Sequence, residues 1–354
     1  MTLPGWRDIN KKLYSGFRFA VRLMENNKDR KIVCLINPLA ANKRWKRRRR
    51  LRAELVKRLP GSCLDTPRTK EETVAMTRTV CSSADLVVAV GGDGTIADVL
   101  QGIFESGRQE QVIFGVIPFG SGNAFRKSLG IPRNPFRAIK YIQEGDIFPI
   151  DLIKIEDRVA AFASIGSTAA VTGEKVRNTI PGLLGHLLAA RKLLFYKRNE
   201  NVLELSQAID QKGRQYERLT VTSRFLDCVI GNSNYFGYSW LVAPQAKLDD
   251  GYLDIILFEM PPLIYILLFP FIYFGWMQRK LKHFKAREVT VKGQALEVQY
   301  NGEYLGALDS VHIQVLPGVL KVMGNRKKAA RFLVRKDVSP VDQQPVAAKP
   351  ATGS

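Results

Sequence analysis

Apolar runs that end in glycine-rich turns organise the first 160 residues. Leu86–Val90 is continuously apolar, and Ile32–Ile36 and Val112–Ile117 have a similar pattern. Such runs are typical of strands buried on both faces of a sheet. We expect helices between and after them at Lys70–Val80 and Ile96–Phe104. Strands alternating with helices predict an α/β domain whose strands are parallel.

Further along the chain the apolar segments are shorter and are joined by turns. Antiparallel strands are expected at Phe162–Ser167, Val202–Ser206, Glu217–Thr222 and Phe225–Ile230, and again at Tyr252–Phe258, Val289–Tyr300 and Val311–Val315. A long helical stretch is expected at Val176–Lys197. The second half of the chain therefore predicts a separate, mainly antiparallel domain.

Two glycine loops follow neighbouring strands of the predicted α/β domain. Gly91–Thr95 reads GGDGT, and Gly120–Asn123 reads GSGN. Glycine lets backbone N–H groups approach an anion closely, and the N-terminus of the next helix favours negative charge. Asp93 would repel a phosphate unless it holds a cation or accepts a proton. The pattern indicates a nucleotide site, and the simpler alternative is a tight turn without a ligand.

Composition narrows the range of partners. The chain has 354 residues, a formal net charge of +21 and a pI near 9.9. This excess favours nucleic acids, anionic membranes or phosphorylated ligands. The four cysteines form no metal-binding pattern and fit a reducing compartment, and the N-terminus shows no apolar signal segment.

Four motifs in order carry a family resemblance. They are GGDGT, the P-x-G-S-x-N pattern at Pro118–Asn123, KLDDGYLD at Lys247–Asp254, and Asn301-Gly302-Glu303. Together they resemble the diacylglycerol kinase family, which includes bacterial lipid kinases and sphingosine kinases. NAD kinases and phosphofructokinases are more distant relatives. The resemblance covers roughly Lys31 to Met323.

The resemblance implies a domain plan. It implies an NAD kinase/phosphofructokinase-like α/β nucleotide-binding domain at 31–156 and a mainly antiparallel β-sandwich lipid-substrate domain at 157–304. The segment after about 305 returns to the first domain. We expect a basic N-terminal helix at 1–30 and, at 325–354, a basic segment followed by a disordered tail.

The resemblance also implies site residues. Glu303 matches the proton acceptor of bacterial members, and Asp93 matches the base favoured in sphingosine kinases and NAD kinases. A structural Mg²⁺ would be held by the side chain of Asp250 and the backbone carbonyls of Lys247 and Tyr252. The implied ATP-binding residues are Asn37, Thr66, Gly91, Gly92, Gly94, Thr95, Gly120, Ser121 and Asn123.

The implied activity is transfer of the γ-phosphate of ATP to a lipid hydroxyl, with Mg²⁺ neutralising charge. Diacylglycerol is the first candidate substrate and a sphingoid base the second. Asn301 stands where the family has aspartate, and Ala97-Asp98 replaces the family's Asn-Glu. A catalytically weakened lipid- and nucleotide-binding protein is therefore one alternative, and an NAD kinase-like enzyme is another. A nucleic-acid binder rests on charge alone.

Two stretches predict membrane contact. Lys43–Arg52 is strongly basic, and the simpler alternative is a helix face exposed to water. Because it has only Trp45 for base stacking, an anionic lipid surface is favoured over nucleic acid as a partner. Met260–Met277 is uncharged, but Pro270 interrupts it, and the strands on either side belong to one domain under the family resemblance. We expect a helix that packs on the domain or dips into one leaflet, followed by cations at the headgroups, namely Arg279, Lys280, Lys282 and Lys285. The implied location is cytoplasmic, at the inner face of the membrane, and a homodimer is a further candidate assembly.

Overall fold

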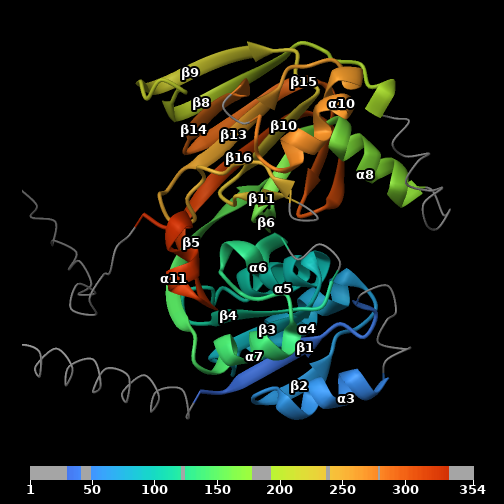
Figure 1. The fold of residues 1–354 in the computed structure, drawn as a ribbon, viewed down its shortest axis with the longest axis vertical. Coiled ribbons are helices and arrows are strands. Elements are labelled where there is room, and N and C mark those ends of the chain that lie inside the picture. The colour runs from blue at the N-terminus through green and yellow to red at the C-terminus, as the bar shows by residue number, and fades with distance from the viewer. Residues whose placement is uncertain are drawn as a thin grey trace, which may run out of the picture.

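A computed structural model describes residues 30–40, 49–120, 124–177, 193–236, 240–277 and 280–334 (Figure 1). The expected N-terminal helix at 1–30 and most of the stretch expected at Val176–Lys197 lie outside these residues. The chain forms two domains. The helix-covered first domain occupies the lower half of Figure 1, and the strand-rich second domain occupies the upper half.

The first domain is built on parallel strands in the order β2-β1-β3-β4. Every residue of β1 and β3 is buried, which explains their continuous apolar sequences. The strands are β1 (Ile32–Ile36), β2 (Ser62–Asp65), β3 (Leu86–Gly91) and β4 (Ile113–Pro118). The helices are α3 (Arg49–Arg58), α4 (Lys70–Cys81), α5 (Asp93–Glu105), α6 (Ala124–Ser128) and α7 (Pro135–Gln143).

The second domain is antiparallel, and its strands form a closed circuit. The pairing runs β15-β7-β10-β13-β14-β8 and returns to β15. Alternating inward side chains such as Leu203, Leu205 and Val289 fill the space inside the circuit. The elements are β6 (Arg158–Ala160), β7 (Phe162–Gly166), α8 (Ser167–Arg177), β8 (Asn201–Ile209), β9 (Gln215–Ser223), β10 (Asp227–Gly231), β11 (Tyr235–Phe236), β12 (Trp240–Leu241), β13 (Leu253–Phe258), α10 (Pro262–Tyr273), β14 (Lys282–Ala286) and β15 (Glu288–Tyr300).

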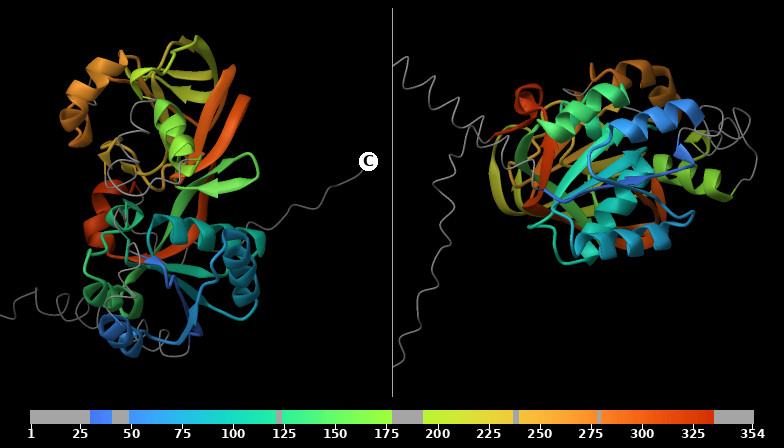
Figure 2. Two further views of the ribbon diagram at one scale, coloured as in Figure 1. Left: turned by 90° about the vertical axis from the view of Figure 1, so that its right-hand side faces the viewer. Right: turned by 90° about the horizontal axis from the view of Figure 1, so that it is seen from below.

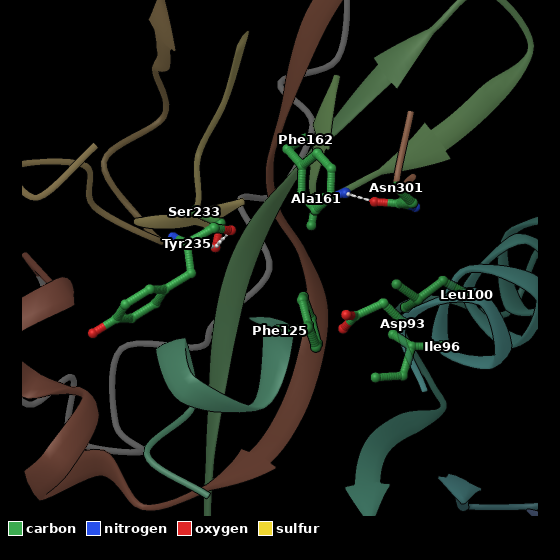
Figure 3. Close-up of a pocket in the computed structure, with 9 residues that line it drawn as sticks. All are labelled: Asp93, Ile96, Leu100, Phe125, Ala161, Phe162, Ser233, Tyr235 and Asn301. Carbon is green, nitrogen blue, oxygen red and sulfur yellow. Dashed lines mark hydrogen bonds between the residues drawn. The ribbon is translucent and has the colours of Figure 1, made fainter. Parts of the chain in front are cut away.

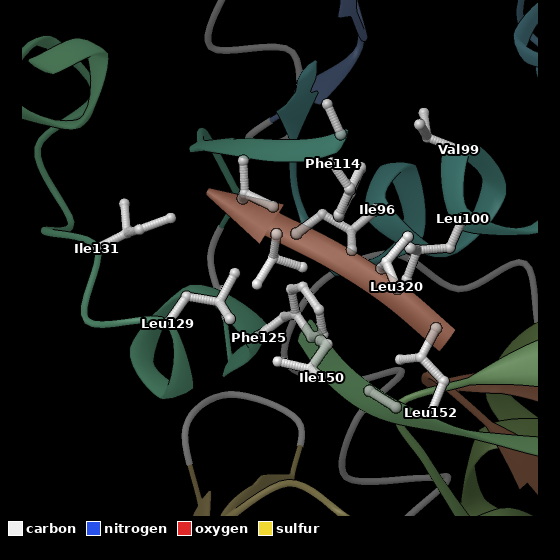
Figure 4. Close-up of a cluster of buried hydrophobic side chains, with 14 of the residues drawn as sticks. Ile96, Val99, Leu100, Phe114, Phe125, Leu129, Ile131, Ile150, Leu152 and Leu320 are labelled. Atoms are coloured by element: carbon white, nitrogen blue, oxygen red, sulfur yellow. The ribbon is translucent and has the colours of Figure 1, made fainter. Parts of the chain in front are cut away.

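Two long strands join the domains. β16 (Glu303–Gly324) pairs with β15 at its start and, near its end, lies between β4 and β5 (Asp146–Ile155). Its register shifts between Leu316 and Leu320, around Gly318, whose φ is +58°. Leu320 then enters the core of the first domain with Phe114, Phe125 and Ile150 (Figure 4). The two domains therefore share one continuous sheet.

Three helical segments differ from the expectations. α5 begins at Asp93 rather than Ile96, with Gly92 at its N-cap. α8 follows directly after β7, in a stretch where no helix was expected. Residues 326–332, expected to start a tail, form α11 (Arg326–Ala329) and the 3₁₀ helix η2 (Ala330–Phe332), and Phe332 is buried.

The apolar stretch at Met260–Met277 contains α10, a helix of 12 residues. None of the helices in the described part of the chain is long and apolar enough to span a bilayer.

Candidate active site

The expected nucleotide-binding residues gather where β1, β2, β3 and β4 end. The amide of Asn37 donates to Thr95 Oγ1 at 2.8 Å, and the N–H of Thr66 donates to the Ile36 carbonyl at 2.8 Å. The N–H of Phe119 donates to the carbonyl of Gly91 at 2.7 Å. These contacts connect loops that are up to 58 residues apart in sequence. Ser121 and Asn123 lie outside the described residues.

Close approach leaves no room for a Cβ at Gly91 and only a tight space for one at Gly92. A Cβ on Gly91 would lie 2.4 Å from Thr95 Oγ1, and one on Gly92 would lie 3.2 Å from the Cα of Gly120. Gly94 is exposed and faces open space. Among the described residues, no side chain caps α5, so N–H groups of its first turn point toward the loop. This end of α5 suits an anion.

A cleft between the domains begins at Asp93. The carboxylate of Asp93 accepts the N–H of Ala124 at 2.9 Å, which joins the two glycine loops. Figure 3 shows this carboxylate pointing into the cleft. The cleft encloses about 300 Å³, part of it open to solvent. Its lining residues are Asp93, Ile96, Leu100 and Phe125 from the first domain and Ala161, Phe162, Ser233, Tyr235 and Asn301 from the second.

Glu303 interacts with the first domain through a lysine. The Lys70 ammonium forms an ion pair with Glu303 and donates to the hydroxyl of Tyr300 at 2.6 Å. The Tyr300 hydroxyl in turn donates to Glu303 at 3.1 Å. Burial opposes the charge on Lys70, but its bonds to Glu303 and Tyr300 outweigh burial and raise its pKa. Glu303 is therefore held by two donors, one from each domain.

The partners of Glu303 were missed from the sequence. Lys70 is the first residue of α4, where the helix dipole disfavours a cation. Because a lysine is unfavourable at a helix N-terminus, its presence there was a signal in the sequence for a nearby acidic partner.

Asp98 is a third carboxylate in this region. Burial raises its pKa to about 7, and the nearby negative charge of Glu303 adds to the effect. Its Oδ1 is buried and accepts no hydrogen bond from the described residues. Asp98 therefore exchanges a proton near neutral pH, at the position where the family carries a longer carboxylate.

Asn301 has a structural place in the cleft wall. Its Oδ1 accepts the N–H of Ala161 at 3.0 Å, drawn in Figure 3, and its backbone N–H donates to the Phe162 carbonyl at 3.0 Å. Its φ is +48°, a left-handed conformation that asparagine tolerates well. The side chain thus fastens the β15–β16 turn to the strands β6 and β7.

A group of cations lies beside the cleft on and near α6. Burial lowers the pKa values of Arg126 and Lys127, and repulsion from Arg133 lowers both further. The Lys127 ammonium lies 4.8 Å from the ring centre of Tyr235, which lines the cleft. Because the cations repel one another, an anion bound among them would relieve the repulsion.

The turn expected to hold a structural Mg²⁺ contains an ammonium group. Lys285 Nζ lies 2.5 Å from Asp250 Oδ2, and the other oxygen of Asp250 accepts the Tyr252 N–H at 3.1 Å. The ammonium of Lys247 donates to the Arg331 carbonyl at 2.7 Å. Among the described residues there is no cluster of three acidic, histidine or cysteine side chains suited to a metal. The expected ligands are one carboxylate and two backbone carbonyls, and in this structure the Lys285 ammonium already supplies positive charge to that carboxylate, so the magnesium site stays a prediction.

Comparisons with known proteins agree with this architecture. The family model "Diacylglycerol kinase catalytic domain" matches residues 31–155, and "YegS C-terminal NAD kinase beta sandwich-like domain" matches residues 164–324. A diacylglycerol kinase of Staphylococcus saprophyticus is 25% identical over 251 residues, which cover 70% of this chain and 79% of that protein. One from Staphylococcus aureus is 25% identical over 70% and 77% of the two chains.

A solved structure of a Bacillus anthracis diacylglycerol kinase shares the fold, with a TM-score of 0.60 and 20% identity, over 84% of this chain and 98% of that one. An α/β domain with two glycine loops, a following β sandwich-like domain and a cleft between them that includes Asp93 form the two-domain arrangement that these family models describe. This chain belongs to the diacylglycerol kinase family and is a kinase that phosphorylates a lipid alcohol.

Proposed function

We propose that the protein transfers the γ-phosphate of ATP to the hydroxyl of a membrane lipid. Diacylglycerol is the first candidate substrate and a sphingoid base the second. The observation that carries the proposal is the Asp93 carboxylate, which lies between two glycine loops at the uncapped N-terminus of α5. We further propose that the first domain has the NAD kinase/phosphofructokinase-like fold and acts at the inner, cytoplasmic face of the membrane.

In this proposal, ATP lies along the ends of the parallel strands. Asn37, Thr66 and the Gly91–Thr95 loop contact the nucleotide, together with Gly120, Ser121 and Asn123. Phosphate oxygens receive N–H groups from the start of α5, where the helix dipole favours negative charge. Arg126 and Lys127, on α6 beside the cleft, supply positive charge. Mg²⁺ arriving with ATP neutralises phosphate charge when bound.

Two carboxylates then share the proton chemistry. Glu303 accepts the proton of the lipid hydroxyl while oxygen attacks the γ-phosphate, and Asp93 orients the substrate. Lys70 and Tyr300 hold the Glu303 carboxylate in one orientation. Asp98, with a pKa of about 7, lies close enough to Glu303 for their charges to interact.

The contacts of Asn301 help to decide between an active kinase and the alternative of a catalytically weakened one. Its side-chain oxygen accepts a backbone N–H, so an aspartate here would make the same bond. Its amide also reaches the carbonyl of Val159 at 3.5 Å, a contact that an ionised aspartate cannot donate. These contacts support a structural role, and we propose an active enzyme rather than a disabled one.

The test is phosphate transfer from γ-labelled ATP to lipids in mixed micelles. The panel contains diacylglycerol, sphingosine, ceramide and phosphatidylglycerol. We expect label in diacylglycerol, reduced about 10³-fold by Asp93→Asn and about 10²-fold or more by Glu303→Gln. Asn301→Asp is the matched control and should not increase the rate. If Asn301→Asp alone restored transfer to an inactive wild type, the weakened-kinase alternative would be correct.

A further inference from the structure

α10 exposes apolar side chains on almost all sides. The helix has no charged residue, and within it only Tyr265 and Ile272 are buried. Leu263 is 62% exposed and Leu267 is 67% exposed, and just beyond the helix Trp276 is 71% exposed. A patch of this size is uncommon on a soluble protein that has no partner for it. The exposed members near the helix are Leu263, Ile264, Ile266, Leu267, Phe269, Phe271, Phe274 and Trp276.

The helix is held so that these side chains stay exposed. Trp240 Nε1 donates to the carbonyl of Ile272 at 3.0 Å. The ring of Trp240 lies 5.7 Å from that of Phe269, and Tyr265 packs edge-on against Phe258 at 5.7 Å. In the left view of Figure 2, α10 (orange) projects at the edge of the second domain. The exposed surface is therefore part of the folded state.

Cations lie at the margin of this surface. Lys282 forms an ion pair with Glu259 at 2.8 Å, and Arg198 donates to the carbonyl of the same residue at 3.4 Å, just before α10 begins. Two exposed lysines are near these cations in sequence: Lys197 next to Arg198, and Lys280 two residues before Lys282. An apolar centre with a basic margin is complementary to an anionic leaflet, where each cation contributes about 1 kcal/mol.

A row of packed rings connects this surface with the cleft. Phe162, which lines the cleft, lies 4.5 Å from Phe236 between ring centres. Phe236 lies 5.4 Å from Trp240, which contacts Phe269 of α10. A helix docked on a membrane would therefore hold the cleft at a fixed orientation relative to the lipid.

We propose that α10, with Phe274 and Trp276, forms an insertion surface that enters one leaflet of an anionic membrane. A helix of 12 residues is about 18 Å long, against about 30 Å of hydrocarbon, so it lies within one leaflet. The inference deepens the proposed function, because it rests on a lipid substrate and assigns the surface that meets it.

The experiment measures binding of the full chain to vesicles of phosphatidylcholine, with and without phosphatidylglycerol. Leu267→Glu and Phe274→Glu place a charge on the insertion surface, whereas Leu64→Glu changes an exposed leucine of the first domain and is the matched control. We expect each insertion-surface variant to bind vesicles at least about tenfold more weakly than wild type. The reason is that an apolar side chain of leucine size is no longer transferred from water into the membrane. The control should bind as wild type.

Two further readouts separate this inference from the proposed function. Lipids brominated along the acyl chain should quench wild-type tryptophan fluorescence, and Trp276→Phe should remove most of the quenching. With a short-chain, water-soluble diacylglycerol, the insertion-surface variants should keep wild-type turnover while losing turnover on vesicles. Vesicle binding without phosphorylation of any lipid would support the surface and overturn the proposed function.

Other outcomes overturn the inference itself. Unchanged vesicle binding in both insertion-surface variants would exclude α10 as the inserting element. If wild type were a dimer in sedimentation and Leu267→Glu a monomer with unchanged vesicle binding, the surface would be an interface between two copies of the chain.

Discussion

Two groups of carboxylates in this protein differ in their partners. The cleft group consists of Asp93, which lines the cleft, and of Asp98 and Glu303, which interact electrostatically with each other. The turn group consists of Asp151, Asp249, Asp250 and Asp254, near the Lys247–Tyr252 turn. Both groups come from stretches that resemble family motifs.

The carboxylates of the turn group have partners within the protein: Asp151 and Asp249 accept backbone N–H groups, whereas Asp250 and Asp254 contact the side chains of Lys285 and His283. Asp151 accepts from Gly251 at 2.6 Å and from Gly318 at 2.7 Å, which ties β5 to the turn and to the register shift of β16. Asp249 accepts from Val334 at 2.6 Å. In the cleft group, Asp93 borders the open space of the cleft. One oxygen of Asp98 has no hydrogen-bond partner among the described residues, and the same is true of one oxygen of Asp254 in the turn group. The same residue type is therefore structural in one group and suited to chemistry in the other.

The largest expected effect is on Asp93. Asp93→Asn keeps the acceptor for Ala124 but removes the charge from the cleft. We expect kcat to fall about 10³-fold, equivalent to about 4 kcal/mol, with the melting temperature nearly unchanged. Initial rates with γ-labelled ATP and a thermal melt measure the two quantities. Wild-type turnover in this variant would place Asp93 with the structural carboxylates.

Asp151→Asn should show the opposite pattern. The amide turns an NH₂ group toward one of two backbone N–H donors that the carboxylate now satisfies, at a cost of about 3 kcal/mol. We expect the melting temperature to fall by about 6 °C or more. Turnover per folded molecule, measured well below that temperature, should stay near wild type. A loss of turnover with unchanged melting would contradict the division into two groups.

Lys285→Gln tests whether a side chain supplies the charge expected from magnesium. The Lys285–Asp250 pair is only partly exposed, with side-chain exposures of 21% and 13%, so its loss should cost about 2 kcal/mol. We expect EDTA to leave the wild-type melting temperature unchanged. The variant should melt lower and recover in part with MgCl₂. A fall in the wild-type melting temperature on adding EDTA would show that a divalent ion is needed despite Lys285.

The smallest effect concerns Asp98 and pH. Its pKa is about 7 in the folded chain, against about 4 when unfolded. Between pH 4 and pH 7 this carboxyl group is mostly ionised in the unfolded chain but protonated in the folded chain. The free energy of unfolding therefore decreases as pH rises through this range. Asp98→Asn removes this decrease. From pH 5 to pH 8, the stability of the variant relative to wild type should increase by about 1 kcal/mol after allowance for solvent screening. Melting temperatures of both proteins, measured across this pH range, test this. A constant difference across this range would contradict the raised pKa.

Local signals predicted much of the first domain. The apolar runs that became β1 and β3 were buried throughout, and glycines after β3 and β4 placed Asp93 at the right sheet edge. These features depend on neighbours in sequence, which makes them readable from the chain alone. The start of α5 was placed too late because Gly92 and Gly94 read as loop, although Gly92 is its N-cap.

Long-range partners could not be read in this way. Lys70 and Glu303 are 233 residues apart and come from different domains. Lys285 reaches Asp250 because β13 and β14 pair in a register that sets Asp254 opposite Lys285. The buried Phe332 was hidden in a basic segment, and only the tertiary structure supplies the surface against which it packs.

The shared strand β16 has a consequence for synthesis on the ribosome. The outer edge of β4 pairs with Lys321 and Val322, which are made about two hundred residues after β4 itself. Until then the first domain carries an unfinished sheet with an open edge, which is prone to pairing with other chains. The first domain is thus translated first and completed last, because a chain released before residue 321 lacks the residues that pair with β4.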